Sequence, residues 1–138
     1  MADGELLIDT SVAVPIVLAD HEAHDETIQV VRDERLGLSG HAWFETYSVL
    51  TRLPPGARRP PEVVQALMRT NFPASRFLGA AATSGLVAEI ARLGIAGGAV
   101  YDALVGAAAR AHGLPLLSRD RRARATYEKL GVEVRFLG

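Results

Sequence analysis

Five short apolar segments are spaced along the chain, and longer segments with helical patterning separate them. The apolar segments cover residues 5–9, 36–39, 75–78, 114–118 and 132–136. A short apolar run bounded by turn residues is typical of a buried strand, and strands that alternate with helices are typical of a parallel sheet. The chain is therefore expected to fold as an α/β domain around a mainly parallel sheet of four or five strands.

Between the apolar segments, the spacing of apolar and polar side chains predicts helices. These helices are expected over residues 11–19, 21–36, 41–53, 62–70, 83–93, 99–112 and 121–130. Thr83 or Ser84 is expected to cap the fifth of them, because a hydroxyl there can accept a hydrogen bond from a free backbone N–H. Residues 54–61 contain four prolines and a glycine, so they are expected to form a surface loop.

The composition limits what the chain can be. Its 138 residues are enough for one domain, so a single domain over residues 1–138 is expected. It has no cysteine, which excludes disulfides, thiolate zinc sites, iron–sulfur clusters and cysteine nucleophiles. No apolar stretch reaches the roughly 18 residues of a membrane span, and no basic segment typical of a secretory signal precedes the first strand. We therefore expect a cytoplasmic protein that does not enter a membrane.

Several catalytic motifs are missing from the sequence. It contains no G-x-S-x-G elbow of serine hydrolases, and neither a G-x-G-x-x-G motif nor a Walker A loop. These absences disfavour a serine hydrolase of that type and chemistry driven by ATP or NAD. A net charge of −1 also argues against a protein coated with positive charge for binding polyanions.

Four acidic residues stand apart from the acids of the charged, solvent-facing helix surfaces. Asp9 ends the first apolar segment, and Asp120 lies two residues after the fourth. Glu45 is flanked by aromatic residues, and Asp102 lies in the most apolar helical segment of the chain. A carboxylate is almost never buried without a partner, since removing its charge from water costs several kcal/mol. These four side chains are therefore candidates for a functional site.

The α/β arrangement is expected to bring these acids together. The carboxyl ends of parallel strands converge on one crevice, where Asp9 and Asp120 are expected, and Glu45 and Asp102 lie near the starts of helices that can reach it. Four converging carboxylates repel one another, and a hard divalent cation such as Mg²⁺ or Mn²⁺ relieves that repulsion. Such a site can activate water for an in-line displacement at phosphorus.

A plainer role remains open for two of these residues. Asp9 precedes residues 11–19 and Asp120 precedes residues 121–130, so each is in position to cap the start of a helix. Capping explains Asp102 less well, because that residue lies within a helical segment.

The residues around these acids resemble a known family. The segments that carry the resemblance are Leu7-Ile8-Asp9-Thr10-Ser11, Phe44-Glu45-Thr46, Tyr101-Asp102-Ala103 and Leu116-Leu117-Ser118-Arg119-Asp120. Together they look like a PIN domain, and most like the VapC-type toxins of bacterial toxin–antitoxin pairs. The resemblance extends from Leu6 to Phe136 and implies a three-layer α/β/α fold.

This resemblance implies a metal-dependent endoribonuclease that uses Mg²⁺ or Mn²⁺. The acids that match the family's catalytic quartet are Asp9, Glu45, Asp102 and Asp120. We expect Asp9 and Asp102 to hold the principal metal ion, and Glu45 and Asp120 to complete its shell partly through water. The hydroxyls that match the family's assisting groups are those of Thr10, Ser11 and Ser118. The family further implies an RNA substrate, a cognate VapB-type antitoxin, and a toxin homodimer within a higher toxin–antitoxin complex.

Basic residues surround the last acid. They are Arg119, Arg121, Arg122 and Arg124. Because the planar guanidinium group binds phosphate with two hydrogen bonds, we expect these residues to contact RNA beside the metal site. Such contacts position RNA without reading its sequence. The alternative is that these residues form the solvated face of the last helix.

A partner protein needs an apolar groove. Val14 and Ile16 in the first expected helix, and Trp43 and Tyr47 in the third, are candidates for it, although core packing explains each of them as well. Two other functions also remain open: a PIN nuclease in RNA processing, and a PIN-like module that binds a partner without catalysis. The small size of the chain favours the toxin, and the intact quartet argues against a module without catalysis.

Overall fold

The computed structural model describes residues 4–138, and a four-stranded sheet forms its centre. The strands are β1 (Glu5–Ile8), β2 (Arg35–Leu38), β3 (Leu116–Ser118) and β4 (Val134–Phe136). They lie in the order β2-β1-β3-β4, and every neighbouring pair is parallel. β1 is thus an inner strand, and Leu7 and Ile8 have no exposed surface. A strand buried on both faces is expected to be a nearly continuous apolar run, as β1 is.

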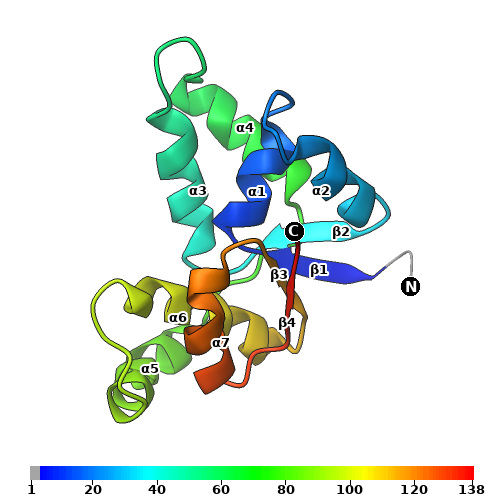
Figure 1. Ribbon diagram of the computed structural model, residues 1–138. Helices are drawn as coiled ribbons and strands as arrows, with labels where there is room; N and C mark the ends of the chain where they lie inside the picture. The colour runs from blue at the N-terminus through cyan, green and yellow to red at the C-terminus, as the bar shows by residue number, and fades with distance from the viewer. Residues whose placement is uncertain (1–3) are drawn as a thin grey trace.

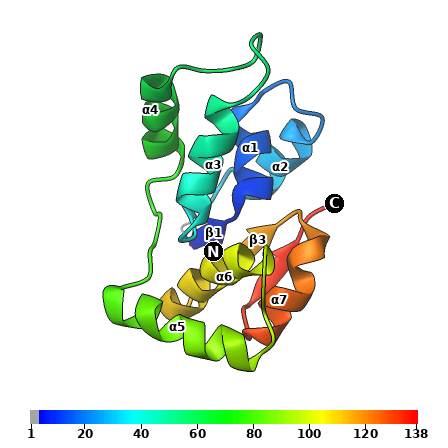
Figure 2. The same cartoon turned by 90° about the vertical axis from the view of Figure 1, so that its left-hand side faces the viewer.

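Helices cover both faces of this sheet. On one side lie α1 (Thr10–Val17), α2 (His24–Val31), α3 (Ala42–Thr51) and α4 (Pro61–Asn71) (Figures 1 and 2). On the other side lie α5 (Ala80–Arg92), α6 (Ala99–His112) and α7 (Arg124–Lys129), and a short 3-10 helix, η1 (Arg121–Ala123), precedes α7. The expected three-layer α/β/α fold with a parallel sheet is confirmed. No helix among residues 4–138 is long and apolar enough to cross a membrane.

The fifth strand expected over residues 75–78 does not form. Ser39 and Arg76 make only an isolated parallel bridge beside β2. The backbone N–H of Leu38 donates to the side-chain Oγ of Ser75 at 2.9 Å. A side chain therefore takes the place that a backbone carbonyl would hold in a sheet, so the ladder stops after one bridge.

The charged helix expected over residues 21–36 is shorter than predicted. α2 ends at Val31, and β2 already begins at Arg35. Leu36, which the helical pattern included, is buried in the sheet opposite Leu6. The apolar run of β2 thus overrides the helical periodicity, because strand pairing with β1 buries it more completely.

The expected cap at the start of α5 is also wrong. The helix begins at Ala80, and its N-cap residue Gly79 makes no side-chain hydrogen bond. The Thr83 hydroxyl instead donates back to the carbonyl of Gly79 at 2.8 Å, and the Ser84 hydroxyl donates to that of Ala81 at 3.2 Å. Hydroxyls inside a helix commonly bond to a preceding carbonyl in this way, so they do not mark its first residue.

The proline-rich segment behaves as expected up to its last residue. α3 ends at Thr51, and α4 begins at Pro61 with Pro60 as its N-cap residue. Proline is favoured at the first position of a helix, because its missing N–H has no partner there in any case. Residues 52–60 form the surface loop between the two helices.

Candidate active site

The carboxyl ends of β1 and β3 place two of the four acids at one edge of the sheet. Asp9 follows Ile8, the last residue of β1, and Asp120 lies two residues after Ser118, the last residue of β3. The two strands are parallel neighbours, with Ile8 opposite Leu117. The chain therefore leaves both strands at the same edge, as expected for parallel strands.

Two helices bring the other two acids to the same place. Glu45 is in the first turn of α3 and Asp102 is in the first turn of α6, on opposite sides of the sheet (Figure 2). All four acids line one hollow of about 210 Å³. The other residues that line it are Thr10, Ser11, Val105, Arg122 and Tyr127. The structure thus brings together the four acids singled out from the sequence, and their catalytic role remains a prediction.

The capping role left open for two of these acids is also real. Asp9 is the N-cap residue of α1, and its side chain accepts a hydrogen bond from the backbone N–H of Ser11 at 3.1 Å. Asp120 is the N-cap residue of η1 and accepts from the backbone N–H of Arg122 at 3.1 Å. Each cap uses one carboxylate oxygen, so capping holds the side chain in place without excluding a second role.

Serine hydroxyls hold the two turns against each other. The Ser11 hydroxyl donates to Asp9 Oδ1 and accepts a hydrogen bond from the backbone N–H of Arg119 at 2.8 Å. The Ser118 Oγ lies 3.4 Å from the Ser11 Oγ and accepts a hydrogen bond from the backbone N–H of Asp120 at 3.0 Å. These two expected supporting hydroxyls therefore fix the backbone on which Asp9 and Asp120 lie.

Glu45 differs from the other three acids in its exposure. The sequence singled it out because aromatic residues flank it, yet its side chain is exposed on α3. The Thr10 hydroxyl lies 3.2 Å from Glu45 Oε1 and donates to it. Thr10 therefore holds Glu45 at the rim of the hollow, and Asp9, which is buried, lies deeper.

Tyr127 of α7 was not singled out from the sequence, yet it belongs to this site. Its side chain is 1% exposed, and its hydroxyl donates to Asp9 Oδ2 at 3.0 Å. A tyrosine on the apolar side of a helix is normally part of the core, which is why the sequence did not reveal it. A buried tyrosine hydroxyl usually needs a partner, and that requirement is the signal that could have linked it to a buried acid.

The acids shift one another's protonation. Burial raises the pKa of Asp9, although hydrogen bonds from Ser11 and Tyr127 oppose the shift. Asp102 is half-buried, and its pKa is raised to about 6, first by burial and then by the charges of Asp120, Glu45 and Asp9. Burial and the Asp9 charge also raise the pKa of Tyr127, so its hydroxyl stays protonated and acts as a donor.

The donor atoms around the hollow suit a hard divalent cation, because most of them are carboxylate and hydroxyl oxygens. Among residues 4–138, however, no three His, Asp or Glu side chains are grouped so that they could hold one metal ion. Mg²⁺ is commonly held by only one or two carboxylates and keeps several waters. The residues therefore fit an ion that takes few ligands directly from the protein.

Comparison with known proteins identifies the family to which this fold belongs. Residues 6–129 match the PIN domain family. This chain belongs to the PIN-domain family. The PIN domain is 45% identical over 129 residues to the ribonuclease VapC27 of Mycobacterium tuberculosis, with 94% of each chain covered. It is also 45% identical over 128 residues to the ribonuclease VapC40 of the same species, with 91% of this chain and 94% of that one covered.

A solved structure has the same fold as this PIN domain. It is VapBC2 from Rickettsia felis, bound to a DNA fragment from its promoter. The TM-score is 0.67, with 97% of this chain and 99% of that chain covered at 12% sequence identity. A likeness at this identity concerns the fold, and it agrees with the three layers seen in Figures 1 and 2.

The four arginines expected to contact RNA do not share one location in the PIN domain. Arg122 lines the acidic hollow, and its Nε donates to Asp120 Oδ1 at 3.1 Å. Arg119 instead forms an ion pair with Glu26 of α2, with an N–O distance of 2.6 Å. Successive residues of a helical turn point in different directions, so neighbours in sequence do not all face the hollow.

The remaining two arginines lie against an aromatic ring. The guanidinium carbons of Arg121 and Arg124 are 5.5 and 4.5 Å from the centre of the Phe136 ring. This cation–π contact holds both side chains over β4. Neither residue lines the acidic hollow as the structure has it.

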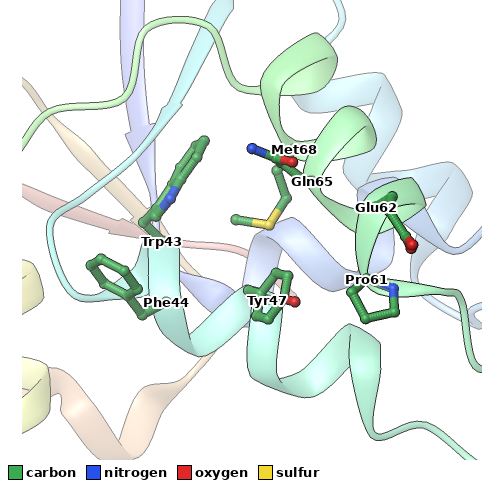
Figure 3. Close-up of a pocket in the computed structure, with 7 residues that line it drawn as sticks. All are labelled: Trp43, Phe44, Tyr47, Pro61, Glu62, Gln65 and Met68. Atoms are coloured by element: carbon green, nitrogen blue, oxygen red, sulfur yellow. The ribbon is translucent and has the colours of Figure 1, made fainter.

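A second hollow, of about 430 Å³, lies between α3 and α4 of the PIN domain (Figure 3). Its lining residues are Trp43, Phe44, Tyr47, Pro61, Glu62, Gln65 and Met68. Two of the four residues expected to form a groove, Trp43 and Tyr47, therefore do so. The other two do not: Ile16 is buried in the core and Val14 packs against it, because α2 and α3 cover α1.

Proposed function

We propose that this PIN domain is an endoribonuclease toxin of the VapC type, which hydrolyses RNA phosphodiester bonds. The proposal rests on the meeting of four acids from separate segments in one hollow of about 210 Å³. Like charges held close together oppose folding, so their presence at one place favours a functional role. The 45% identity to proteins named as ribonucleases VapC27 and VapC40 supports the same activity.

We further propose that the reaction uses Mg²⁺ or Mn²⁺. Asp9 and Asp102 would hold the ion, and Glu45 and Asp120 would reach it partly through water, in keeping with the separation of the four carboxylates. A divalent cation in such a site supplies a Lewis acid that lowers the pKa of water and offsets negative charge at phosphorus. Its charge would also relieve the repulsion around Asp102.

The chain's own residues prepare this site for RNA. Ser11 and Ser118 fix the two turns that carry Asp9 and Asp120, and Thr10 holds Glu45 at the rim. The side chain of Arg122 is 93% exposed, so it can leave its carboxylate partner at little cost. We propose that Arg122 then binds a phosphate of the RNA with its planar guanidinium group.

We propose that a small VapB-type antitoxin binds in the groove between α3 and α4. Phe44 is 64% exposed and Tyr47 is 38% exposed, although both are aromatic. Exposed aromatic residues gathered in one groove are typical of protein interfaces. As parts of the same proposal, the toxin forms a homodimer within a larger toxin–antitoxin complex and acts in the cytoplasm, where its RNA substrate is found.

Cleavage of total cellular RNA by the purified protein tests this function. Reactions contain Mg²⁺, Mn²⁺ or excess EDTA, and they compare the wild type with Asp9→Asn. Asp20→Asn, which changes an exposed acid outside the hollow, serves as the matched control. Discrete fragments that require both metal and Asp9 would support the proposal. Intact RNA after incubation with folded, antitoxin-free protein and metal would contradict it.

A further inference from the structure

Hydrogen bonds from three donors hold the Asp9 carboxylate. The backbone N–H and the hydroxyl of Ser11 both donate to Oδ1, and the hydroxyl of Tyr127 donates to Oδ2 at 3.0 Å. A carboxylate offers about four lone-pair positions, and both hydrogen bonds to Oδ1 come from Ser11. Tyr127 is the donor that holds Oδ2, so its hydroxyl sets the direction in which the remaining capacity of that oxygen points.

A glycine inside α6 gives Tyr127 room to reach Asp9. A Cβ atom at Gly106 would lie 3.0 Å from Tyr127 Cδ1 and 3.0 Å from Val132 Cγ2, closer than side chains normally approach. Gly106 lies one helical turn after Asp102 on α6. A glycine inside a helix makes that helix less stable than an alanine would. Its presence is explained by the Tyr127 ring, which lies against the helix at this point.

We propose that Tyr127 is a positioning residue that orients Asp9 for the divalent cation, and that Gly106 provides the slot for its ring. This inference rests on the proposed function, because it assumes that Asp9 binds the ion. The last torsion of an aspartate side chain has a broad energy minimum, so the carboxylate turns easily unless hydrogen bonds hold it. Outer partners of metal ligands generally fix such orientations, and losing one weakens metal binding or activity by 10–100-fold.

Tyr127→Phe tests the role of the hydroxyl, because it removes one oxygen atom and keeps the ring. The probe is Mn²⁺, titrated calorimetrically into the metal-free full chain. We expect its Kd to rise about 10–100-fold in a variant that loses some thermal stability with the buried hydrogen bond but is still folded at the titration temperature. Cleavage of RNA by Tyr127→Phe at low Mn²⁺ should also fall, and it should recover as Mn²⁺ is raised, which a purely structural defect would not allow.

Two further variants make the result decisive. Thr27→Val is the matched control: it removes another buried hydroxyl, one on α2 that has no hydrogen-bond partner among the described residues. Its Kd for Mn²⁺ should equal that of the wild type. Gly106→Ala keeps the Tyr127 hydroxyl but crowds its ring, and it should weaken Mn²⁺ binding in the same direction.

The outcomes distinguish a failure of this inference from a failure of the proposed metal site. If the wild type binds Mn²⁺, Asp102→Asn does not, and Tyr127→Phe binds as the wild type does, the positioning role is wrong and the metal site stands. If Tyr127→Phe proves unfolded, Gly106→Ala decides, and its normal Mn²⁺ affinity would overturn the inference. Absence of Mn²⁺ binding by the wild type would overturn the proposed metal site and this inference with it.

Discussion

The acidic hollow and the groove between α3 and α4 are built in different ways. Side chains from α1, α3, α6, η1 and α7 line the acidic hollow together with Asp9 and Asp120, and hydrogen bonds join several of them. Among residues 4–138, α3 and α4 alone provide the lining of the larger groove. Figure 3 shows the Met68 side chain between those of Trp43 and Tyr47.

This difference separates two kinds of function. The position of Asp9 depends on the pairing of β1 with β3 and on hydrogen bonds that involve Ser11, Ser118 and Tyr127. The geometry of the acidic hollow is therefore set by the whole fold. A fixed arrangement of charges is what catalysis requires. The groove depends on one pair of helices, and its exposed rings can adjust to a partner. We therefore assign chemistry to the first hollow and recognition to the second.

The largest expected effect is on catalysis in the acidic hollow. Asp9→Asn or Asp102→Asn should lower RNA cleavage by more than ~100-fold, since loss of an outer partner of a metal ligand alone costs 10–100-fold. The rate constant for cleavage of one defined RNA fragment in Mn²⁺ measures this. The affinity of either variant for the antitoxin should change little. Full cleavage activity of either variant would show that the acidic hollow is not the site of the chemistry.

A smaller effect is expected from the groove. Tyr47→Ala removes an exposed aromatic ring from its lining, and truncating such an anchor at an interface commonly costs about 2 kcal/mol. The Kd for the purified antitoxin, measured by calorimetry, should therefore rise by about 30-fold. An unchanged Kd would place the antitoxin elsewhere on the surface.

The charge repulsion in the acidic hollow predicts a pH-dependent stability. Asp102 has a pKa of about 6 in the folded protein against 3.8 as its ordinary value, so the folded state holds the proton more tightly. The stability from this proton is complete below pH 4 and is lost as the pH rises through 6. Asp102→Asn cannot ionise, so in EDTA at pH 7.5 it should be more stable than the wild type by about 1 kcal/mol, after allowance for solvent screening.

Urea unfolding at pH 4 and pH 7.5 measures this difference. The advantage of Asp102→Asn should shrink toward pH 4, where the wild-type carboxyl is protonated in both states. A variant that is less stable than the wild type at pH 7.5 would show that Asp102 stabilises the fold, and the hollow would then lose its functional signature.

The smallest effect should come from a site outside both hollows. Thr27 is fully buried, and its Oγ1 has no hydrogen-bond partner among the described residues. Replacing a buried polar group that lacks a partner with an apolar one of the same shape is nearly neutral or stabilising. Thr27→Val should change the free energy of unfolding by no more than about 0.5 kcal/mol toward instability. A larger loss in urea unfolding would mean that this hydroxyl has a partner.

The sequence predicted the positions of the four acids well, because their placement follows from simple rules. Asp9 and Asp120 lie just after the ends of two parallel strands, and such ends meet at one edge of a sheet. Asp102 is a charge in an apolar helix, which is costly unless it serves a purpose. These acids could thus be recognised in the sequence because charged residues stand where the surrounding pattern is apolar.

Features that depend on tertiary contacts were not predictable in the same way. Tyr127 lies 118 positions from Asp9 in the chain, and nothing in its local pattern indicates the partner of its hydroxyl. The strand expected over residues 75–78 is missing because the Ser75 hydroxyl accepts a hydrogen bond from the N–H of Leu38, 37 positions away in the chain. The same segment passes close to Gly37, where a Cβ would lie 2.2 Å from the backbone of Ala74. A glycine inside a strand can indicate such an approach, but it does not identify the neighbour.

We propose above that the acidic hollow is a metal centre. Anomalous diffraction from crystals soaked in Mn²⁺ tests it most directly, because it locates the ion without reference to activity. We expect an anomalous peak beside the carboxylates of Asp9 and Asp102, and its loss in crystals of Asp102→Asn. A Mn²⁺-loaded crystal with no peak in that hollow, or with a peak that remains in Asp102→Asn, would contradict it.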